Sequence, residues 1–124
     1  MKKIKWAILG AARVNEKLIP AIVGSNDGQL VAIGSRRDNS SKECLLRFAP
    51  DQSDNVECYK GFDSILNDEK VDAIYIPLSN EEHTETALKA INNKKHVLIE
   101  KPMAIKSKEV ELLFEAAKKK NVKI

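Results

Sequence analysis

The chain has little cysteine, and its two cysteines lie far apart. Cys44 and Cys58 form no C-x-x-C pair and no cluster with either histidine of the 124-residue sequence. This spacing argues against a zinc site, so we expect no metal centre. Two separated thiols favour a reduced, cytoplasmic protein.

Long hydrophobic runs are also absent. No segment approaches a membrane span, and the N-terminus lacks the apolar core of a signal peptide. The net charge is only +3, with acids and bases interspersed, which argues against a nucleic-acid footprint. The densest basic run, Lys118 to Lys120, falls at a predicted helix end, where cations suit the dipole. We therefore expect neither nucleic acid nor a membrane as a partner.

The sequence that is present alternates short apolar runs with amphipathic stretches. With 43% hydrophobic residues and no repeat or low-complexity linker, residues 1–124 read as one domain. The apolar runs predict strands at 6–9, 30–33, 56–59, 71–76, 96–99 and 122–124, and helices lie between them. We predict capping boxes at Ser40 and Ser79 and a helix cap at Ser107. The last helix is expected to bury Val110, Leu113, Phe114 and Ala117.

This alternation predicts an α/β protein with a doubly wound parallel sheet covered on both faces. Right-handed crossovers then favour the Rossmann order 3-2-1-4-5-6. In that order the first and fourth strands flank the switch point, where ligands gather outside the strand carboxyl ends. The segments that follow the strands are therefore the candidate site.

The first such segment is Gly10-Ala11-Ala12-Arg13-Val14-Asn15, between a strand and a helix. It is a partial version of the dinucleotide fingerprint G-x-G-x-x-G, with Ala12 for the second glycine and Asn15 for the third small residue. The free N–H groups of the following helix would suit a diphosphate. We expect the bulkier Asn15 to loosen the packing of helix on strand. The alternative is an ordinary crossover turn.

The second segment, Ser35-Arg36-Arg37, favours NADP over NAD as the cofactor. A site for NAD usually has an acid at this strand end, and here Asp38 comes later. Arginine is suited to binding a phosphate through two charge-assisted hydrogen bonds. The alternative is that the arginines are solvated surface residues.

The third and fourth segments follow the later strands. Ser79 and Asn80 either cap a helix or line a ligand, and His83 in the first helical turn either donates to a ligand or faces water. Lys101 is a candidate proton donor or substrate anchor, and Glu100 beside it offers an ion pair. Pro102 could fix this turn through a cis bond.

Together these segments resemble the N-terminal domain of the Gfo/Idh/MocA family of NAD(P)-dependent oxidoreductases. The resemblance covers essentially the whole chain, in the family's order and spacing, and its most specific mark is Glu100-Lys101-Pro102. The opening is most similar to the branch that includes dihydrodiol and xylose dehydrogenases. The matching stretches are residues 5–13, 34–36, 72–80 with His83, and 95–104.

The resemblance implies hydride transfer between NADP(H), or NAD(H), and a hydroxyl or carbonyl group of a sugar, polyol or related compound. It implies a catalytic role for Lys101, which would also reach the nicotinamide ribose. The cofactor-binding residues would be Gly10, Ala11, Ala12, Arg13, Val14, Ser35, Arg36, Arg37, Leu78, Ser79, Asn80, His83, Glu100 and Lys101.

Family members carry a second domain that supplies most of the substrate pocket, and residues 1–124 do not contain it. We expect the chain to be a fragment that stops at the sixth strand, to be inactive alone and to self-associate through an exposed strand edge. The alternative is a stand-alone dinucleotide-binding or interaction module without catalysis. A flavodoxin-like phosphoacceptor domain would need acids after the first strand, where Gly10-Ala11-Ala12 supplies none.

Overall fold

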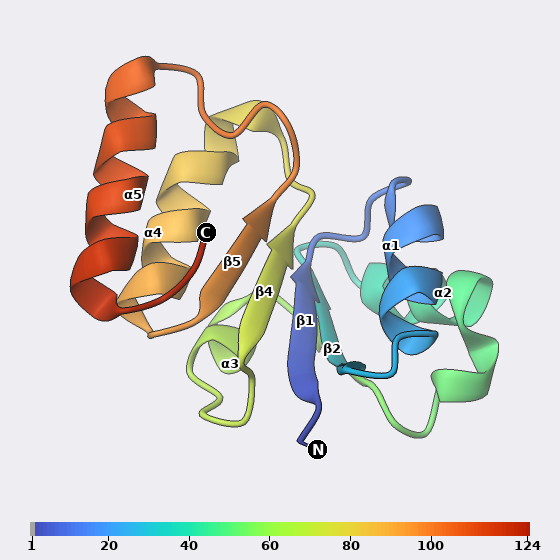
Figure 1. The fold of residues 1–124 in the computed structure, drawn as a ribbon. Helices are drawn as coiled ribbons and strands as arrows, with labels where there is room; N and C mark the ends of the chain where they lie inside the picture. The colour runs from blue at the N-terminus through green and yellow to red at the C-terminus, as the bar shows by residue number, and fades with distance from the viewer. Residues whose placement is uncertain (1) are drawn as a thin grey trace.

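The computed structural model of the protein describes residues 2–124. It contains one five-stranded parallel sheet in the order β3-β2-β1-β4-β5 (Figure 1). The strands are β1 Ile4–Leu9, β2 Gly28–Ser35, β3 Glu57–Lys60, β4 Ala73–Ile76 and β5 His96–Ile99. The helices are α1 Asn15–Val23, α2 Ser40–Phe48, α3 Asp63–Leu66, α4 His83–Asn92 and α5 Ser107–Lys120, with short 3₁₀ helices η1 Pro50–Gln52 and η2 Asn80–Glu82.

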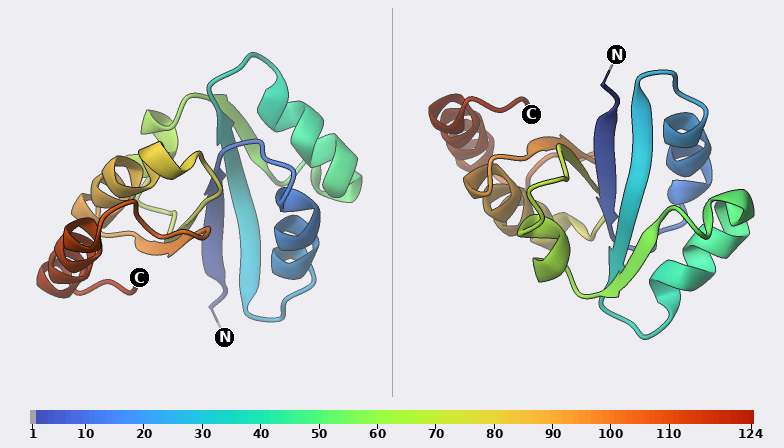
Figure 2. Two further views of the ribbon diagram at one scale, coloured as in Figure 1. Left: turned by 90° about the horizontal axis from the view of Figure 1, so that it is seen from above. Right: turned by 90° about the horizontal axis from the view of Figure 1, so that it is seen from below.

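Helices cover both faces of the sheet, as the sequence predicts. Figure 2 shows α1 and α2 on one side of the strands and α4 and α5 on the other. Successive side chains of β1 alternate between the layers: Ala7 and Leu9 pack in the core under α4 and α5, and Ile8 packs in the core under α1 and α2. Because β1 is buried on both faces, its sequence is a continuous apolar run. Because all the strands are parallel, their carboxyl ends lie at the same edge of the sheet.

The predicted sixth strand is not formed within residues 2–124. Residues 122–124 lie beside β5, where the Val97 N–H donates to the Lys123 carbonyl at 2.9 Å. The Lys123 N–H donates in turn to the Nδ1 atom of His96 at 3.0 Å. A side chain thus takes the place of a second backbone acceptor, and no strand ladder develops.

Two of the three predicted helix caps are wrong. Asn39 precedes α2 in the left-handed region at φ 61°, so Ser40 is already helical and its side chain caps nothing. At α5, the Glu109 carboxylate accepts the N–H groups of Ile105 and Lys106 in place of a cap by Ser107. These hydrogen bonds hold the pKa of Glu109 below its usual value.

The apolar face of α5 also differs from the prediction. Leu113 and Ala117 are buried as expected, whereas Phe114 is 51% exposed and Leu112 is 47% exposed. This helix has α4 on one side and no partner within residues 2–124 on the other. No helix in that range is long and apolar enough to cross a membrane.

Candidate functional site

The turn after β1 requires glycine. Gly10 has φ +128°, and a Cβ atom there would lie 3.0 Å from Cδ2 of Leu78. Its N–H donates to the Gly34 carbonyl at 2.8 Å, which ties the ends of β1 and β2 together. The missing side chain lets the β4–α4 loop close over the turn, so the edge of the sheet is compact at its centre.

Asn15 fastens this turn and does not loosen it. The side chain is completely buried, and its Nδ2 group donates to the Gly10 carbonyl at 2.9 Å and to Sγ of Cys44 at 3.4 Å. The expectation of looser packing is therefore wrong, because the amide replaces small-residue contact with hydrogen bonds. Burial raises the pKa of the Cys44 thiol, which keeps it neutral beside the amide.

The loop between β1 and α1 presents unused backbone donors. Within residues 2–124, the N–H groups of Ala11, Ala12, Arg13 and Val14 donate to no protein acceptor. The first helical bonds run from Asn15 to the Ala12 carbonyl and from Glu16 to the Arg13 carbonyl. Consecutive free N–H groups at a helix N-terminus attract an anion such as a phosphate.

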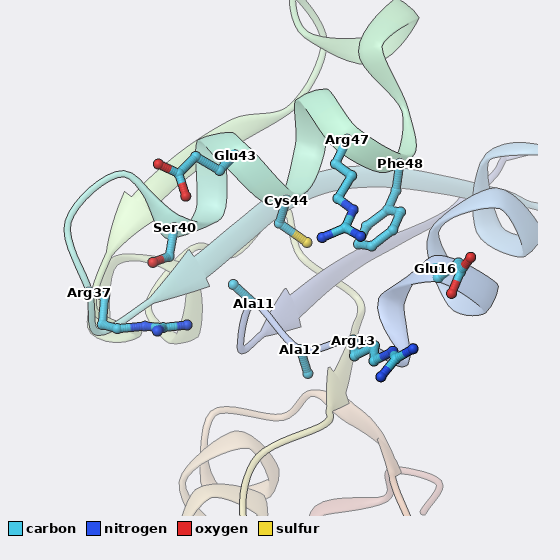
Figure 3. Close-up of a pocket in the computed structure, with 10 residues that line it drawn as sticks. All are labelled: Ala11, Ala12, Arg13, Glu16, Arg37, Ser40, Glu43, Cys44, Arg47 and Phe48. Atoms are coloured by element: carbon cyan, nitrogen blue, oxygen red, sulfur yellow. The ribbon is translucent and has the colours of Figure 1, made fainter.

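A hollow of about 550 Å³ lies beside this loop, and we call it the arginine hollow (Figure 3). The guanidinium groups of Arg37 and Arg47 extend into it from opposite ends in Figure 3. The lining holds three arginines and two glutamates, so positive charge is in slight excess and, with the adjoining N–H groups, favours an anion. Its lining residues are Ala11, Ala12, Arg13, Glu16, Arg37, Ser40, Glu43, Cys44, Arg47 and Phe48.

A second, smaller groove of about 230 Å³ crosses the carboxyl edge from β2 to β4 over Gly10. It brings together three of the four segments that the sequence singles out. Its lining residues are Gly10, Ala11, Ala12, Ser35, Arg36, Arg37, Phe62, Pro77, Leu78 and Ser79. Asn80 is exposed at the start of η2, and Val14 is half-buried at the start of α1.

Ser35, the last residue of β2, and the two arginines that follow it have different surroundings. Ser35 is buried, and its Oγ atom accepts the Arg37 N–H at 3.3 Å. Arg36 forms an ion pair with Glu82 and lies over the Phe62 ring, 5.1 Å from its centre. Arg37 is exposed and lines both hollows. Asp38, the acid nearest to the strand end, is paired with Lys60 at 2.9 Å.

His83 is buried and joins two loops at the carboxyl edge. Its Nδ1 atom is 2.7 Å from the Pro102 carbonyl oxygen, and its Nε2 atom is 2.9 Å from the Leu78 carbonyl oxygen. Both ring nitrogens are therefore engaged with the protein's own backbone, and the ring does not face water. His83 therefore links the β4–α4 loop to the Lys101–Pro102 turn, whose peptide bond is cis.

Tyr75 and Glu100 form the other buried contact at this end. The Tyr75 hydroxyl, from a side chain that is 1% exposed, donates to the Glu100 carboxylate at 2.5 Å. Burial first, and then the neighbouring Glu100 carboxylate, raise the pKa of Tyr75 above its usual value. The phenol therefore stays protonated and holds the carboxylate in place.

Lys101 is exposed beside this contact. Its ammonium makes no hydrogen bond or ion pair with any residue in the range 2–124, so the expected pair with Glu100 is not formed. Glu100 is occupied by Tyr75, and Lys101 keeps all its donors available. A free ammonium near a fixed carboxylate at one edge of the sheet can polarise or orient an oxygen-bearing ligand.

The sequence does not predict the part that several residues play at this edge. Tyr75 and Phe62 appear in the sequence as core residues, and Glu82 appears only as part of a capping box with Ser79. Arg47 lies on the polar side of a helix, with no local pattern to set it apart. The spacing of Glu82 three residues after Ser79 is the one signal that foretells a contact, and that capping box is confirmed.

A parallel doubly wound sheet whose first turn carries free N–H groups over the switch point defines a dinucleotide-binding α/β protein. The chain belongs to the Gfo/Idh/MocA oxidoreductase family, since the family model for the NAD-binding Rossmann fold matches residues 4–124.

Individual relatives support this assignment. An oxidoreductase of Rhizobium meliloti, ORF334, is 34% identical over 93% of the chain and 33% of its own length. The trans-1,2-dihydrobenzene-1,2-diol dehydrogenase of Xenopus laevis is 31% identical over 95% of the chain and 35% of its own length. The crystal structure of KijD10, a 3-ketoreductase of Actinomadura kijaniata in complex with NADP and TDP-benzene, has a TM-score of 0.88 and is 30% identical, covering 98% of this chain and 36% of that one. The chain thus spans about a third of the length of these relatives.

Proposed function

We propose that the chain is the NADP(H)-binding part of an oxidoreductase that interconverts a hydroxyl and a carbonyl group on a sugar, polyol or related small molecule. The observation that carries the proposal is the turn at Gly10, where a glycine-dependent close approach is followed by the free N–H groups of Ala11 to Val14. This arrangement suits a diphosphate that bridges β1 and α1. The nicotinamide, when bound, supplies the hydride chemistry.

The residues at the edge fit such a cofactor from end to end. The diphosphate would be held by residues 10–14, and the adenosine ribose by Ser35 and Arg37 beside the arginine hollow. At the other end, Glu100 would accept hydrogen bonds from the nicotinamide ribose, with its carboxylate oriented by Tyr75. Leu78 and Ser79 would line the groove between the two ends.

The preference for the 2′-phosphate rests on the charges at the end of β2. The acid that follows the strand most closely in the sequence, Asp38, is paired with Lys60, so its carboxylate is turned to that lysine and not presented to a ribose. Arg37 and Arg47 reach into the arginine hollow instead. The relative KijD10 has a solved complex with NADP, which supports the same choice.

Lys101 is the residue that we propose for the chemistry. Its ammonium is unpaired within residues 2–124, and the residue before it in the sequence is the proposed ribose ligand Glu100. It would hydrogen-bond the reacting oxygen of the substrate and orient or polarise it. The names of the relatives, a diol dehydrogenase and a sugar 3-reductase among them, support an oxygen function on a small molecule as the substrate.

Calorimetric titration of the chain with NADP⁺ and with NAD⁺ tests the proposed cofactor. We expect NADP⁺ to bind more tightly, because the arginines gain charge-assisted hydrogen bonds from the 2′-phosphate. Equal affinities, or tighter binding of NAD⁺, would contradict the preference, and binding of neither would contradict the function itself.

We further propose that the isolated chain self-associates. β5 is an edge strand, and its Leu98 side chain is 45% exposed. Leu112 and Phe114 on α5 are apolar side chains with a similar exposed fraction. Within residues 2–124, the outer side of β5 is covered only by the one backbone hydrogen bond from Val97 to Lys123, and an apolar edge so lightly covered invites pairing with a second copy. Light scattering at rising concentration should show species larger than a monomer, and a monomer at high concentration would refute this.

A further inference from the structure

We propose that Glu82 is a specificity-determining residue that weakens the preference for NADP over NAD by holding Arg36 away from the 2′-phosphate. This inference rests on the proposed function. It concerns the one arginine of the Ser35-Arg36-Arg37 segment that already has an anionic partner.

The contact between Arg36 and Glu82 joins two separate loops. One guanidinium nitrogen of Arg36, at the end of β2, pairs with the Oε1 atom of Glu82 at the end of η2. The guanidinium also lies over the Phe62 ring at 5.1 Å, which fixes it on the α3 side of the groove. Arg36 is thus turned toward α3 and α4, away from the arginine hollow, whose lining does not include it.

Glu82 is itself held in place, so it does not simply follow Arg36. Its Oε2 atom accepts the Ser79 hydroxyl at 2.7 Å and the Ser79 N–H at 3.4 Å. The carboxylate therefore uses one oxygen for the helix cap and the other for Arg36. Only 28% of the Glu82 side chain is exposed, compared with 59% for Arg36. Arg36 has to leave Glu82 before it can turn to a phosphate.

The neighbouring charges do not relieve this competition. Glu85 is paired with Lys89 at 3.2 Å, so that lysine is not free to neutralise Glu82. Arg37, by contrast, has no ion pair with any residue from 2 to 124 and lines both hollows. A 2′-phosphate at the end of β2 would meet the free charge of Arg37 on one side and the carboxylate of Glu82 behind Arg36 on the other.

Removing the charge of Glu82 should therefore tighten the binding of NADP⁺ alone. Glu82→Gln keeps an oxygen that can accept from Ser79 and releases Arg36. Because an exposed ion pair is weak, we expect a gain of about threefold to tenfold in affinity for NADP⁺ and no change for NAD⁺. Glu81→Gln, an exposed neighbour in η2 with the same change in net charge, is the matched control and should alter neither affinity.

The test is calorimetric titration of both dinucleotides into the wild type, Glu82→Gln, Arg36→Ala and the double variant. The gain for NADP⁺ should disappear when Arg36 is also removed, and Glu82→Ala should reproduce the gain if the glutamine variant folds poorly. An unchanged or weakened affinity for NADP⁺ in both Glu82 variants would overturn the inference while leaving the proposed function standing. Equal changes for NADP⁺ and NAD⁺ would also overturn it, since they indicate a helix cap only. If the wild type binds neither dinucleotide, the proposed function fails and this inference fails with it.

Discussion

The two ends of the carboxyl edge are built in opposite ways. On the β1–β2 side, the arginine hollow is open and lined by side chains whose charged groups reach solvent. On the β4–β5 side, Tyr75 and His83 are buried: the Tyr75 hydroxyl donates to Glu100, and the two His83 ring nitrogens contact the carbonyl oxygens of two loops. We call this second region the β4–β5 corner.

The comparison shows which region should control affinity for the dinucleotide and which should control the stability of the fold. Exposed arginines bind an anion by charge and can be lost without disturbing the fold, because water replaces the missing contacts. Buried hydrogen bonds are costly to break, because the remaining partner is left without one. Substitutions in the hollow should therefore change which dinucleotide binds, and substitutions in the β4–β5 corner should change stability.

The largest effect is expected for Lys101→Met in any form of the protein that shows substrate-dependent formation of NADPH. Methionine keeps the length of the side chain and removes the charge, so turnover should fall on the order of 100-fold, the scale of one positioned acid–base group. The affinity for NADP⁺ should change little, since Lys101 makes no contact that supports the fold within residues 2–124. Steady-state kinetics with a parallel titration decides this, and turnover comparable to wild type would remove Lys101 from the mechanism.

The next effect is on stability and comes from His83→Leu. The change removes the polar ring of a completely buried side chain whose nitrogens contact the Leu78 and Pro102 carbonyl oxygens, and should cost about 1–3 kcal/mol of unfolding free energy in urea. His96→Leu is the matched control, because His96 is only half-buried and bonds the exposed Lys123 N–H. Its cost should stay under about 1 kcal/mol. Similar losses in the two variants would contradict the distinction between the corner and the surface.

Tyr75→Phe tests the corner through its pH dependence. Loss of the hydrogen bond to Glu100 should cost about 1–2 kcal/mol at neutral pH. The raised pKa of Tyr75 means that, above pH about 10, the unfolded chain releases a proton that the folded protein keeps. Wild-type stability should therefore fall with rising pH in that range.

The phenylalanine variant lacks this part of the fall, so its stability should approach that of the wild type between about pH 10 and 11. The raised pKa of Cys44 contributes equally to both proteins and cancels in the comparison. Urea unfolding at a series of pH values measures the gap, and a gap that stays constant above pH about 10 would mean that Tyr75 does not carry the shift.

Arg36→Ala acts on the open side and should change binding without changing stability. We expect the affinity for NADP⁺ to fall by about 1.5 kcal/mol, the lower end of the range for charge-assisted hydrogen bonds, because Arg36 must first leave Glu82. The affinity for NAD⁺ and the unfolding free energy should stay nearly unchanged. Calorimetry and urea unfolding read the two quantities separately, and a loss that is equal for both dinucleotides would argue for a structural role.

The sequence predicts the sheet well because each strand leaves a local signal. Runs such as Ala73 to Ile76, which are apolar throughout, identify buried parallel strands, and the observed order through β5 agrees with the Rossmann prediction. The prediction of a sixth strand is wrong because a ladder of hydrogen bonds depends on the adjacent strand β5 as well as on residues 122–124. The predicted caps at Ser40 and Ser107 are wrong because the start of a helix depends on the backbone angles of the residue before it. In the structure Asn39 and Lys106 occupy the N-cap positions.

The sequence predicts where the site lies better than it predicts which residues contact one another there. The segments that follow β1, β2, β4 and β5 do meet at one edge, as parallel topology requires. The partners within that edge come from far apart in the sequence: 25 residues separate Tyr75 from Glu100, and 19 separate His83 from Pro102. No local pattern encodes such pairs. The prediction for Asn15 is wrong for the same reason, since its side chain stabilises the turn through hydrogen bonds to the Gly10 carbonyl and to Sγ of Cys44.

The central claim is that a dinucleotide binds along the carboxyl edge, with its diphosphate on the free N–H groups after Gly10. Titration of ¹⁵N-labelled chain with NADP⁺, followed by amide chemical shifts, tests this most directly. The largest shifts should fall on Ala11 to Val14 and on Ser35 to Arg37. Largest shifts at the opposite edge of the sheet, around Asn67 and Lys94 where another hollow of about 460 Å³ lies, would contradict the claim, as would no shift at saturating nucleotide.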